Sequence, residues 1–196
     1  MFRCFVGLLI LMPFLLQAQS AKVNSPNNQL QAEVYLKDGQ AYYQVIYEGT
    51  TVLEESPLGL FTNLIDYSKD LTWVGSTTNE VKRSYTEKKF KQSQNSYHAN
   101  ELICKLSTKD GHILEVVFWV SNNDIAFRYQ LPEVEEPTAL VVERELTGFN
   151  FPQEAKGFLS PQSTSMVGFK RTKPSYEEGY YIEQDIAAKS ANKLGY

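Results

Sequence analysis

The stretch Glu101-Leu-Ile-Cys-Lys-Leu-Ser-Thr-Lys-Asp-Gly-His-Ile-Leu-Glu-Val-Val-Phe-Trp-Val120 decides the fold. Its first half, up to Thr108, alternates between apolar and polar positions, which is the period of a β-strand. Lys109-Asp-Gly111 then predicts a turn. The second half is apolar at most positions, which is typical of a strand covered on both sides. One face would hold Leu114, Val116, Phe118 and Val120, and the other Ile113, Val117 and Trp119.

The same alternation continues on the C-terminal side of this stretch. Asn122-Asn-Asp124 predicts a turn into the alternating run Ile125 to Leu131. Three consecutive strands joined by short turns pair most simply as antiparallel neighbours. We therefore expect these three strands to form the centre of an antiparallel sheet.

On the N-terminal side, period-two runs recur between turn signals. Leu30 to Leu36 and Tyr43 to Tyr47 alternate on either side of Asp38-Gly39, which predicts a β-hairpin. Glu48-Gly49 starts a second turn into Thr51 to Leu53. Ser56-Pro-Leu-Gly59 predicts a break, with its proline at a strand start or on an edge.

The remaining segments carry weaker patterns. Leu71 to Val74, Ala139 to Val142 and Thr147 to Phe151 are each expected to form a short strand, and the polar segment Glu80 to Asn95 an edge strand or a long loop. Beyond Pro152 the pattern gives way to Gly, Ser, Pro and Thr, where binding loops tend to lie. The chain is therefore predicted to be an all-β, antiparallel, two-sheet β-sandwich of roughly ten strands.

Size and composition limit the function classes. The chain has 196 residues and a formal net charge of −4, which indicates one domain, or one domain and part of another. Hydrophobic residues make up 42% and aromatic residues 13%, enough for a packed core. The acidic balance argues against a nucleic-acid partner, because phosphate binding normally requires a basic patch.

The N-terminus has the pattern of a secretory signal peptide. Arg3 supplies a positive charge, and the apolar run Val6 to Leu16 is too short to span a bilayer comfortably. Small residues follow, with cleavage expected after Ala18 or Ser20. Residues 1–20 are therefore predicted to be a signal peptide and residues 21–196 the domain. The protein is then secreted or periplasmic, with no membrane attachment after cleavage.

Cysteine and histidine offer little chemistry. Cys4 leaves with the signal peptide, so Cys104 cannot form an internal disulfide and is expected to be buried and inert. His98 and His112 with one cysteine cannot supply a usual zinc ligand set. His112 follows a turn glycine and is expected to be solvated, whereas His98 lies either at the surface or in a cleft. No phosphate loop or catalytic triad can be recognised from spacing.

The densest functional chemistry lies in Pro174-Ser-Tyr-Glu-Glu-Gly-Tyr-Tyr181. Tyrosine rings stack on the apolar face of a pyranose, and carboxylates bind Ca²⁺ or accept hydrogen bonds from hydroxyl groups. From the residues alone, the segment is either a sugar or metal site or an aromatic loop that closes the edge of the β-core. The groups concerned are Tyr176, Tyr180 and Tyr181 with Glu177 and Glu178.

Several blocks in order along the chain resemble the amino-terminal domain of glycoside hydrolase family 97. The resemblance covers nearly the whole chain after the signal peptide, and the order of the blocks is more specific than any one of them. The blocks are Asn24–Asn27, Lys37–Gly39, Ser56–Leu60, Asp124–Tyr129, Glu145–Phe151 and Lys173–Glu178.

The resemblance implies a fold and a site. In the family this domain is a β-sandwich similar to galactose mutarotase, followed by a (β/α)8 barrel that carries the catalytic carboxylates. Members hydrolyse α-glucosidic or α-galactosidic bonds with Ca²⁺ at the active site. A glutamate in a Tyr-Glu motif of the amino-terminal domain binds that calcium, and the matching position here is Glu177 after Tyr176, with Glu178 as the adjacent alternative. The chemistry of the tyrosine ring, and not the resemblance, assigns sugar contact to Tyr176, Tyr180 and Tyr181.

The resemblance also predicts which parts of the family enzyme this chain lacks and which partners it would require. We expect the sandwich to be incomplete at its C-terminus and the barrel to be absent, so the chain would hold no catalytic residue and would not hydrolyse substrate alone. Its partners would be an oligosaccharide with α-linked glucose or galactose and a separately encoded catalytic barrel. Two alternatives remain: a freestanding secreted carbohydrate-binding module, and an aldose epimerase, which would need a histidine and a carboxylate converging in a cleft.

Overall fold

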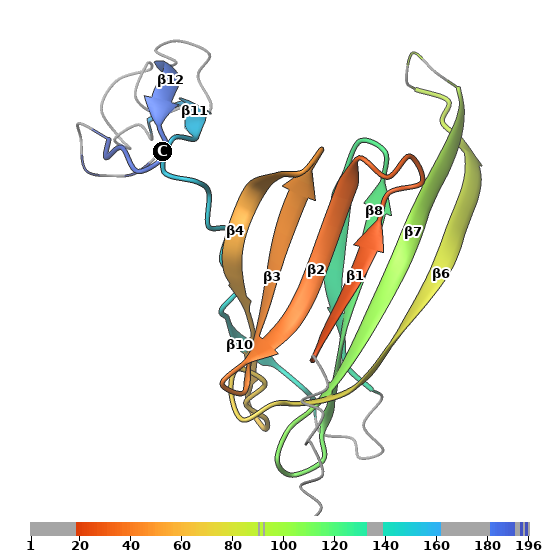
Figure 1. The fold of residues 1–196 in the computed structure, drawn as a ribbon, viewed down its shortest axis with the longest axis vertical. Coiled ribbons are helices and arrows are strands. Elements are labelled where there is room, and N and C mark those ends of the chain that lie inside the picture. The colour runs from red at the N-terminus through yellow and green to blue at the C-terminus, as the bar shows by residue number, and fades with distance from the viewer. Residues whose placement is uncertain are drawn as a thin grey trace, which may run out of the picture.

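The protein is a β-sandwich in which two four-stranded antiparallel sheets face each other (Figure 1). The computed structural model describes residues 19–89, 91, 93–132, 139–161, 181–190, 193 and 195. One sheet has the order β1-β2-β3-β4 and the other β6-β7-β8-β9, and two further two-stranded sheets pair β10 with β5 and β11 with β12. The described residues hold strands and no helix, which confirms the predicted all-β class.

The described part of the chain contains twelve strands, two more than the sequence suggested. Their bounds are β1 Ser20–Asn24, β2 Leu30–Lys37, β3 Gln40–Tyr47, β4 Thr50–Leu58, β5 Leu60–Thr62, β6 Thr72–Thr86, β7 Gln94–Ser107, β8 Ile113–Ser121, β9 Ile125–Gln130, β10 Val142–Glu145, β11 Lys156–Leu159 and β12 Tyr181–Asp185.

The two predicted tight turns in the first sheet are confirmed. Asp38 and Gly39 have φ angles of 51° and 75°, and Glu48 and Gly49 have φ angles of 47° and 81°. Two consecutive residues with positive φ match the twist of a two-residue hairpin. The turns fix the register of β2, β3 and β4, because a shift of one residue would move the apolar side chains to the outside.

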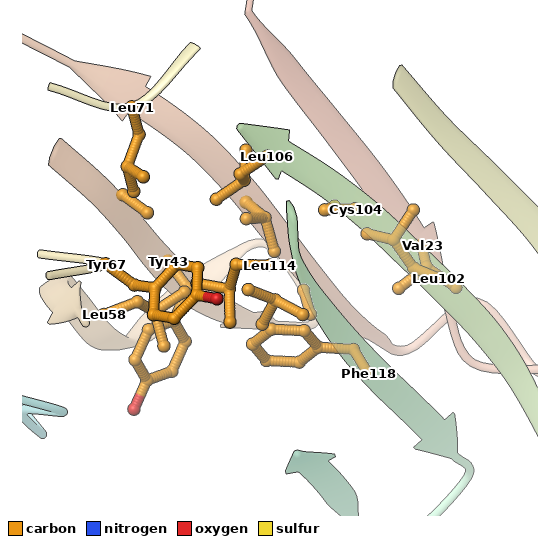
Figure 2. Packing of buried hydrophobic residues seen from close by; sticks show 14 of the residues in the cluster. Val23, Tyr43, Leu58, Tyr67, Leu71, Leu102, Cys104, Leu106, Leu114 and Phe118 are labelled. Carbon is orange, nitrogen blue, oxygen red and sulfur yellow. The ribbon is translucent and has the colours of Figure 1, made fainter. Parts of the chain in front are cut away.

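The core lies between the inner faces of the two sheets, as Figure 2 shows. Tyr43 and Phe118 approach each other across it, with ring centroids 5.6 Å apart. Cys104 is fully buried here, and burial raises the pKa of its thiol to about 12, so the expectation of an inert cysteine is confirmed. Fully buried members include Ala32, Val34, Leu58, Leu102, Leu106, Leu114, Val116 and Val120.

The central strand β8 is covered on its second face only in part. Val117 is 1% exposed, but Ile113 and Trp119 are half-buried. The cover comes from long side chains of the same sheet: the guanidinium carbons of Arg83 and Arg128 lie 4.5 and 5.4 Å from the centre of the Trp119 ring. On the second face of β8, the apolar Trp119 ring is thus covered by the charged side chains of Arg83 and Arg128.

The weakly patterned segment from residue 80 to 95 is mostly strand. β6 is an edge strand that runs from Thr72 to Thr86, and β7 begins at Gln94. Most side chains of β6 are exposed, so this strand needs no strict alternation of apolar and polar residues. The edge-strand alternative was therefore correct, and the separate strand expected at Leu71 to Val74 is the start of β6.

The break expected at Ser56 to Gly59 does not interrupt β4. The strand continues to Leu58, with Pro57 opposite Tyr42. β4 is the last strand of its sheet and pairs with β3 on one side only. The N–H that Pro57 lacks is not needed for the ladder between β4 and β3. The expectation that the proline marks an edge was correct, and the expected break is limited to Gly59, which separates β4 from β5.

The strand expected at residues 147–151 is also absent from the described strands. Gly148 N donates to Pro57 O at 2.9 Å, and Glu54 N donates to Asn150 O at 2.7 Å, so the segment runs along the free edge of β4. Pro57 has no N–H with which to continue this pairing, and no regular ladder forms. The strand expected at 139–142 begins later, as β10.

The first strand was not foreseen, and it bears on the signal-peptide boundary. Ser20 pairs with Tyr35, and Leu36 N donates to Gln19 O at 3.0 Å. Of the two expected cleavage positions, a cut after Ala18 leaves these bonds intact, whereas a cut after Ser20 removes them. Residues 1–18 lie outside the described residues, so the signal peptide stays a prediction. Within the described residues, no helix is long and apolar enough to cross a membrane.

Candidate functional site

Of the site residues predicted from the sequence, the structure describes Tyr181. It is the first residue of β12, lies opposite Leu159 of β11, and is 47% exposed. Tyr176, Glu177, Glu178 and Tyr180 lie outside the described residues. The structure therefore fixes where the predicted segment ends, and the roles of Glu177 and the three tyrosines stay predictions.

A short two-stranded sheet carries that end point. Lys156 of β11 pairs with Asp185 of β12, and their side chains form an ion pair. Ile186 N adds a hydrogen bond to Ala155 O at 3.3 Å. Because Leu159 and Tyr181 are partners in this ladder, the chain segments that lead into and out of residues 160–180 lie side by side.

Tyr181 does not close the edge of the main core. Among the described strands β12 pairs with β11 alone, and the two lie apart from both four-stranded sheets in Figure 1. Phe158 and Ile182 on these strands are 61% and 75% exposed. Tyr181 itself therefore does not contact the edge of the β-core, and the choice between a site and an aromatic loop stays open for the rest of the segment.

The described residues near Tyr181 do not form a calcium site by themselves. Asp185 is bound by Lys156, and Glu183 is exposed. Across the described residues, no group of three or more His, Cys, Asp or Glu side chains could hold a metal ion. Since Ca²⁺ takes six to eight oxygen ligands, a site here would need donors beyond those described.

The two histidines lie at the surface. His98 Nε2 is 2.7 Å from Glu80 Oε1, and Lys82 Nζ is 2.8 Å from the same oxygen. Hydrogen bonds from Lys82 and then from His98 hold the pKa of the Glu80 carboxyl below its usual value. The His98 and Glu80 side chains are 43% and 52% exposed, and His112 is exposed in its turn. His98 and Glu80 do make a histidine–carboxylate pair, but it lies open to solvent instead of converging in a cleft.

A group that sequence analysis missed lies on the outer face of the sheet β6-β7-β8-β9. It combines Arg83, Tyr97, Trp119 and Arg128, which come from four different strands. Their positions in the sequence give no sign of proximity. Only the register of the three strand pairs, in which Arg83 faces Tyr97 and Glu101 faces Trp119, could have predicted it.

The fold and the exposed terminal strands define the class of this protein as an antiparallel β-sandwich domain. The family model for the Glycosyl-hydrolase 97 N-terminal domain matches residues 23–195. The chain belongs to this family, as the ordered sequence blocks predicted.

Known relatives agree with this assignment. A probable retaining alpha-galactosidase from Streptomyces bingchenggensis (strain BCW-1) is 29% identical over 136 residues, which cover 69% of this chain and 20% of the relative. The crystal structure of a beta-arabinopyranosidase matches with a TM-score of 0.78 and 41% identity, over 87% of this chain and 27% of that one.

A Glycoside Hydrolase Family 97 enzyme from Pseudoalteromonas sp. strain K8, solved in complex with panose, shares the fold. Its TM-score is 0.66 at 18% identity, over 72% of this chain and 22% of that one. The same enzyme was also solved in complex with acarbose. The chain thus spans only about a fifth to a quarter of the length of these relatives.

Proposed function

We propose that this chain is the sugar-facing accessory domain of a family 97 α-glycosidase and contributes one carboxylate, Glu177, to an active-site calcium. The observation that carries the proposal is the family match over residues 23–195, which includes the whole Pro174–Tyr181 segment. The exposed position of Tyr181, away from the core, supports it further. The catalytic acid and base belong to a barrel domain and not to these residues.

The relatives favour galactose over glucose within the expected substrate class. The beta-arabinopyranosidase is 41% identical, and the other named relative is a probable retaining alpha-galactosidase. The L form of β-arabinopyranose has the ring-hydroxyl arrangement of α-galactopyranose and lacks only its hydroxymethyl group. A domain shared by both would face sugars of that configuration. The partner is then an oligosaccharide with α-linked galactose.

Within this proposal each predicted residue has a distinct task. Tyr176, Tyr180 and Tyr181 offer ring faces to the apolar side of a pyranose. Glu177 supplies a hard oxygen donor, and bound calcium would add a positive charge beside the sugar hydroxyl groups. Since one carboxylate cannot hold the ion, the other ligands come from the barrel domain. The protein acts outside the cytoplasm, in the periplasm or secreted, if the signal peptide is cleaved as predicted.

The test uses the whole chain mixed with the barrel portion of the related beta-arabinopyranosidase. We expect a complex whose thermal stability rises with added CaCl₂. Glu177→Gln should raise the calcium concentration for half-maximal stabilisation by at least about tenfold, since even residues that only orient metal ligands contribute about 10–100-fold. Glu178→Gln is the matched control and should have a smaller effect.

Two outcomes would contradict the proposal. Equal effects of the two substitutions would show that Glu177 has no special place in calcium binding. A loss of stability in Glu177→Gln of the isolated chain beyond the about 0.5 kcal/mol typical of surface changes would mean that Glu177 is structural. Tight binding of melibiose by the isolated chain that is lost in Tyr181→Ala, with or without calcium, would instead support a freestanding carbohydrate-binding module.

A further inference from the structure

A hollow on the outer face of the sheet β6-β7-β8-β9 has the chemistry of a sugar site. It has a volume of about 560 Å³ and is lined by Arg83, Ser84, Tyr85, Tyr97 and Trp119. This volume lies within the range of about 300–1,000 Å³ that is usual for small-molecule sites. We call these five residues the Trp119 hollow. Trp119 and Tyr97 lie on the outer face of the sheet, because Phe118 and Leu102 on the same strands point into the core. Arg83 pairs with Tyr97, and Tyr85 is two residues further along β6, so both share this face.

The aromatic part of the Trp119 hollow is held rigidly. Trp119 Nε1 donates to Glu101 Oε1 at 2.7 Å, and Asn79 Nδ2 donates to Glu101 Oε2 at 2.9 Å. The bond from Trp119, helped by the nearby guanidinium groups, holds the pKa of the Glu101 carboxyl below its usual value. The Tyr97 ring lies 6.0 Å from that of Trp119. A ligand would therefore meet a surface that is already ordered, which lowers the entropic cost of binding.

Tyr85 provides the accessible ring. Its side chain is 52% exposed and lines the Trp119 hollow from the edge strand β6. A second hollow of about 520 Å³ adjoins the first and shares Ser84 and Tyr85 with it. Tyr85 thus contributes to the lining of both hollows.

The charges in and around the Trp119 hollow indicate a neutral ligand. Arg83 and Arg128 bring two positive charges and pair with no acid within 4.0 Å among the described residues. Glu101 and Asp124 bring two negative charges, and Asp124 accepts a hydrogen bond from Tyr97 Oη at 3.1 Å. Guanidinium groups donate and carboxylate groups accept hydrogen bonds, so both can bind the hydroxyl groups of a sugar, and the two negative charges offset the two positive ones.

We propose that the Trp119 hollow binds a neutral oligosaccharide at a site separate from the predicted Pro174–Tyr181 segment. The ligand class rests on the proposed function, because the family acts on glycosides, but the location does not. β6 and the pair β11-β12 lie on opposite sides of the molecule in Figure 1. Such a site would hold a polysaccharide chain near the enzyme without taking part in hydrolysis.

Tryptophan fluorescence gives a direct test, because the chain has two tryptophans and Trp119 lines the hollow. The whole chain is titrated with melibiose, maltotriose and tri-galacturonic acid. We expect a saturable change with at least one neutral sugar, which persists in Trp73→Phe and disappears in Trp119→Phe. Tyr85→Ala should weaken the apparent affinity by about tenfold, as expected for one aromatic contact.

The matched control is Tyr47→Ala, because Tyr47 is 42% exposed on the other sheet and should leave the affinity unchanged. A change with tri-galacturonic acid alone, no saturable change with any sugar, or equal effects of Tyr85→Ala and Tyr47→Ala would each overturn the inference. Binding that is lost in Tyr181→Ala but kept in Tyr85→Ala would also overturn it, while leaving the proposed function of the terminal segment intact.

Discussion

Removal of a single half-buried hydroxyl group, in Tyr129→Phe, should measurably destabilise the fold. Gly59 N donates to Tyr129 Oη at 3.0 Å, and Tyr129 Oη lies 2.6 Å from Thr147 Oγ1. Thr147 gives its own proton to Glu145 Oε1 at 2.6 Å, so Tyr129 must be the donor to Thr147. The four groups form one directed chain that links β9 to the β4–β5 turn and to the segment after β10.

The expected loss of stability follows from the Gly59 N–H, which is left without an acceptor in Tyr129→Phe. Gly59 is buried, and a buried N–H that loses its acceptor costs about 1–3 kcal/mol. Phenylalanine keeps the edge-to-face contact with Phe127, whose ring centre lies 6.3 Å away. We therefore expect a loss of about 2 kcal/mol, which lowers Tm by about 4–8 °C in a chain of this size.

Urea unfolding followed by circular dichroism measures this loss. Tyr47→Phe is the control and should stay within about 0.5 kcal/mol of the parent chain, because Tyr47 is exposed. Combining Tyr129→Phe with Thr147→Val should show a coupling of about 0.5–3 kcal/mol, since the two hydroxyl groups share one chain. A loss below about 0.5 kcal/mol in Tyr129→Phe, with an unchanged m value, would refute the directed chain.

Two further predictions concern the core. Phe118→Ala should lower the free energy of unfolding by about 3–5 kcal/mol, because it leaves a cavity at a fully buried site. Phe158→Ala, at a side chain that is 61% exposed, should lower it by less than about 0.5 kcal/mol. Similar urea midpoints of the two variants would contradict this packing. Burial raises the pKa of both the Cys104 thiol and the Tyr43 phenol to about 12. Their protonated forms favour the fold, so this stability is complete below the unfolded pKa values of about 8.5 and 10 and declines as pH rises toward 12. Unfolding at several alkaline pH values should show a decline that is shallower in Cys104→Ala; an identical pH dependence in both chains would contradict it.

The parts of the fold that local chemistry determines were predictable. The Asp38-Gly39 and Glu48-Gly49 turns need positive φ angles, which glycine and, to a lesser degree, aspartate accept readily, and each turn contains a glycine. The inner face of β8 follows from its period of two, and Cys104 was placed correctly by the same rule. These features depend on neighbours in the sequence, so a single sequence contains the information.

The parts that depend on distant partners were not predictable. Residues 147–151 look like a strand, but their partner is β4, where Pro57 removes a donor. β11 and β12 are short and lack the alternation that marked the core strands. Predicting the group around Trp119 would require the register of four strands. The Pro174–Tyr181 segment was recognised from its composition and from the family resemblance, neither of which predicts how its side chains are arranged in space.

The path of the chain between the sandwich and the terminal strands connects stability with the proposed function. Residues 146–150 are bound along β4 and the β4–β5 turn: Leu146 N donates to Gly59 O and Gly148 N to Pro57 O, both at 2.9 Å. Tyr43 Oη donates to Gly148 O at 3.0 Å from within the core. β11 follows only a few residues later, so Tyr181 on β12 is reached from the edge of the first sheet. Loosening this segment, as Tyr129→Phe should do, would therefore disturb the placement of Tyr181 while leaving the Trp119 hollow unchanged.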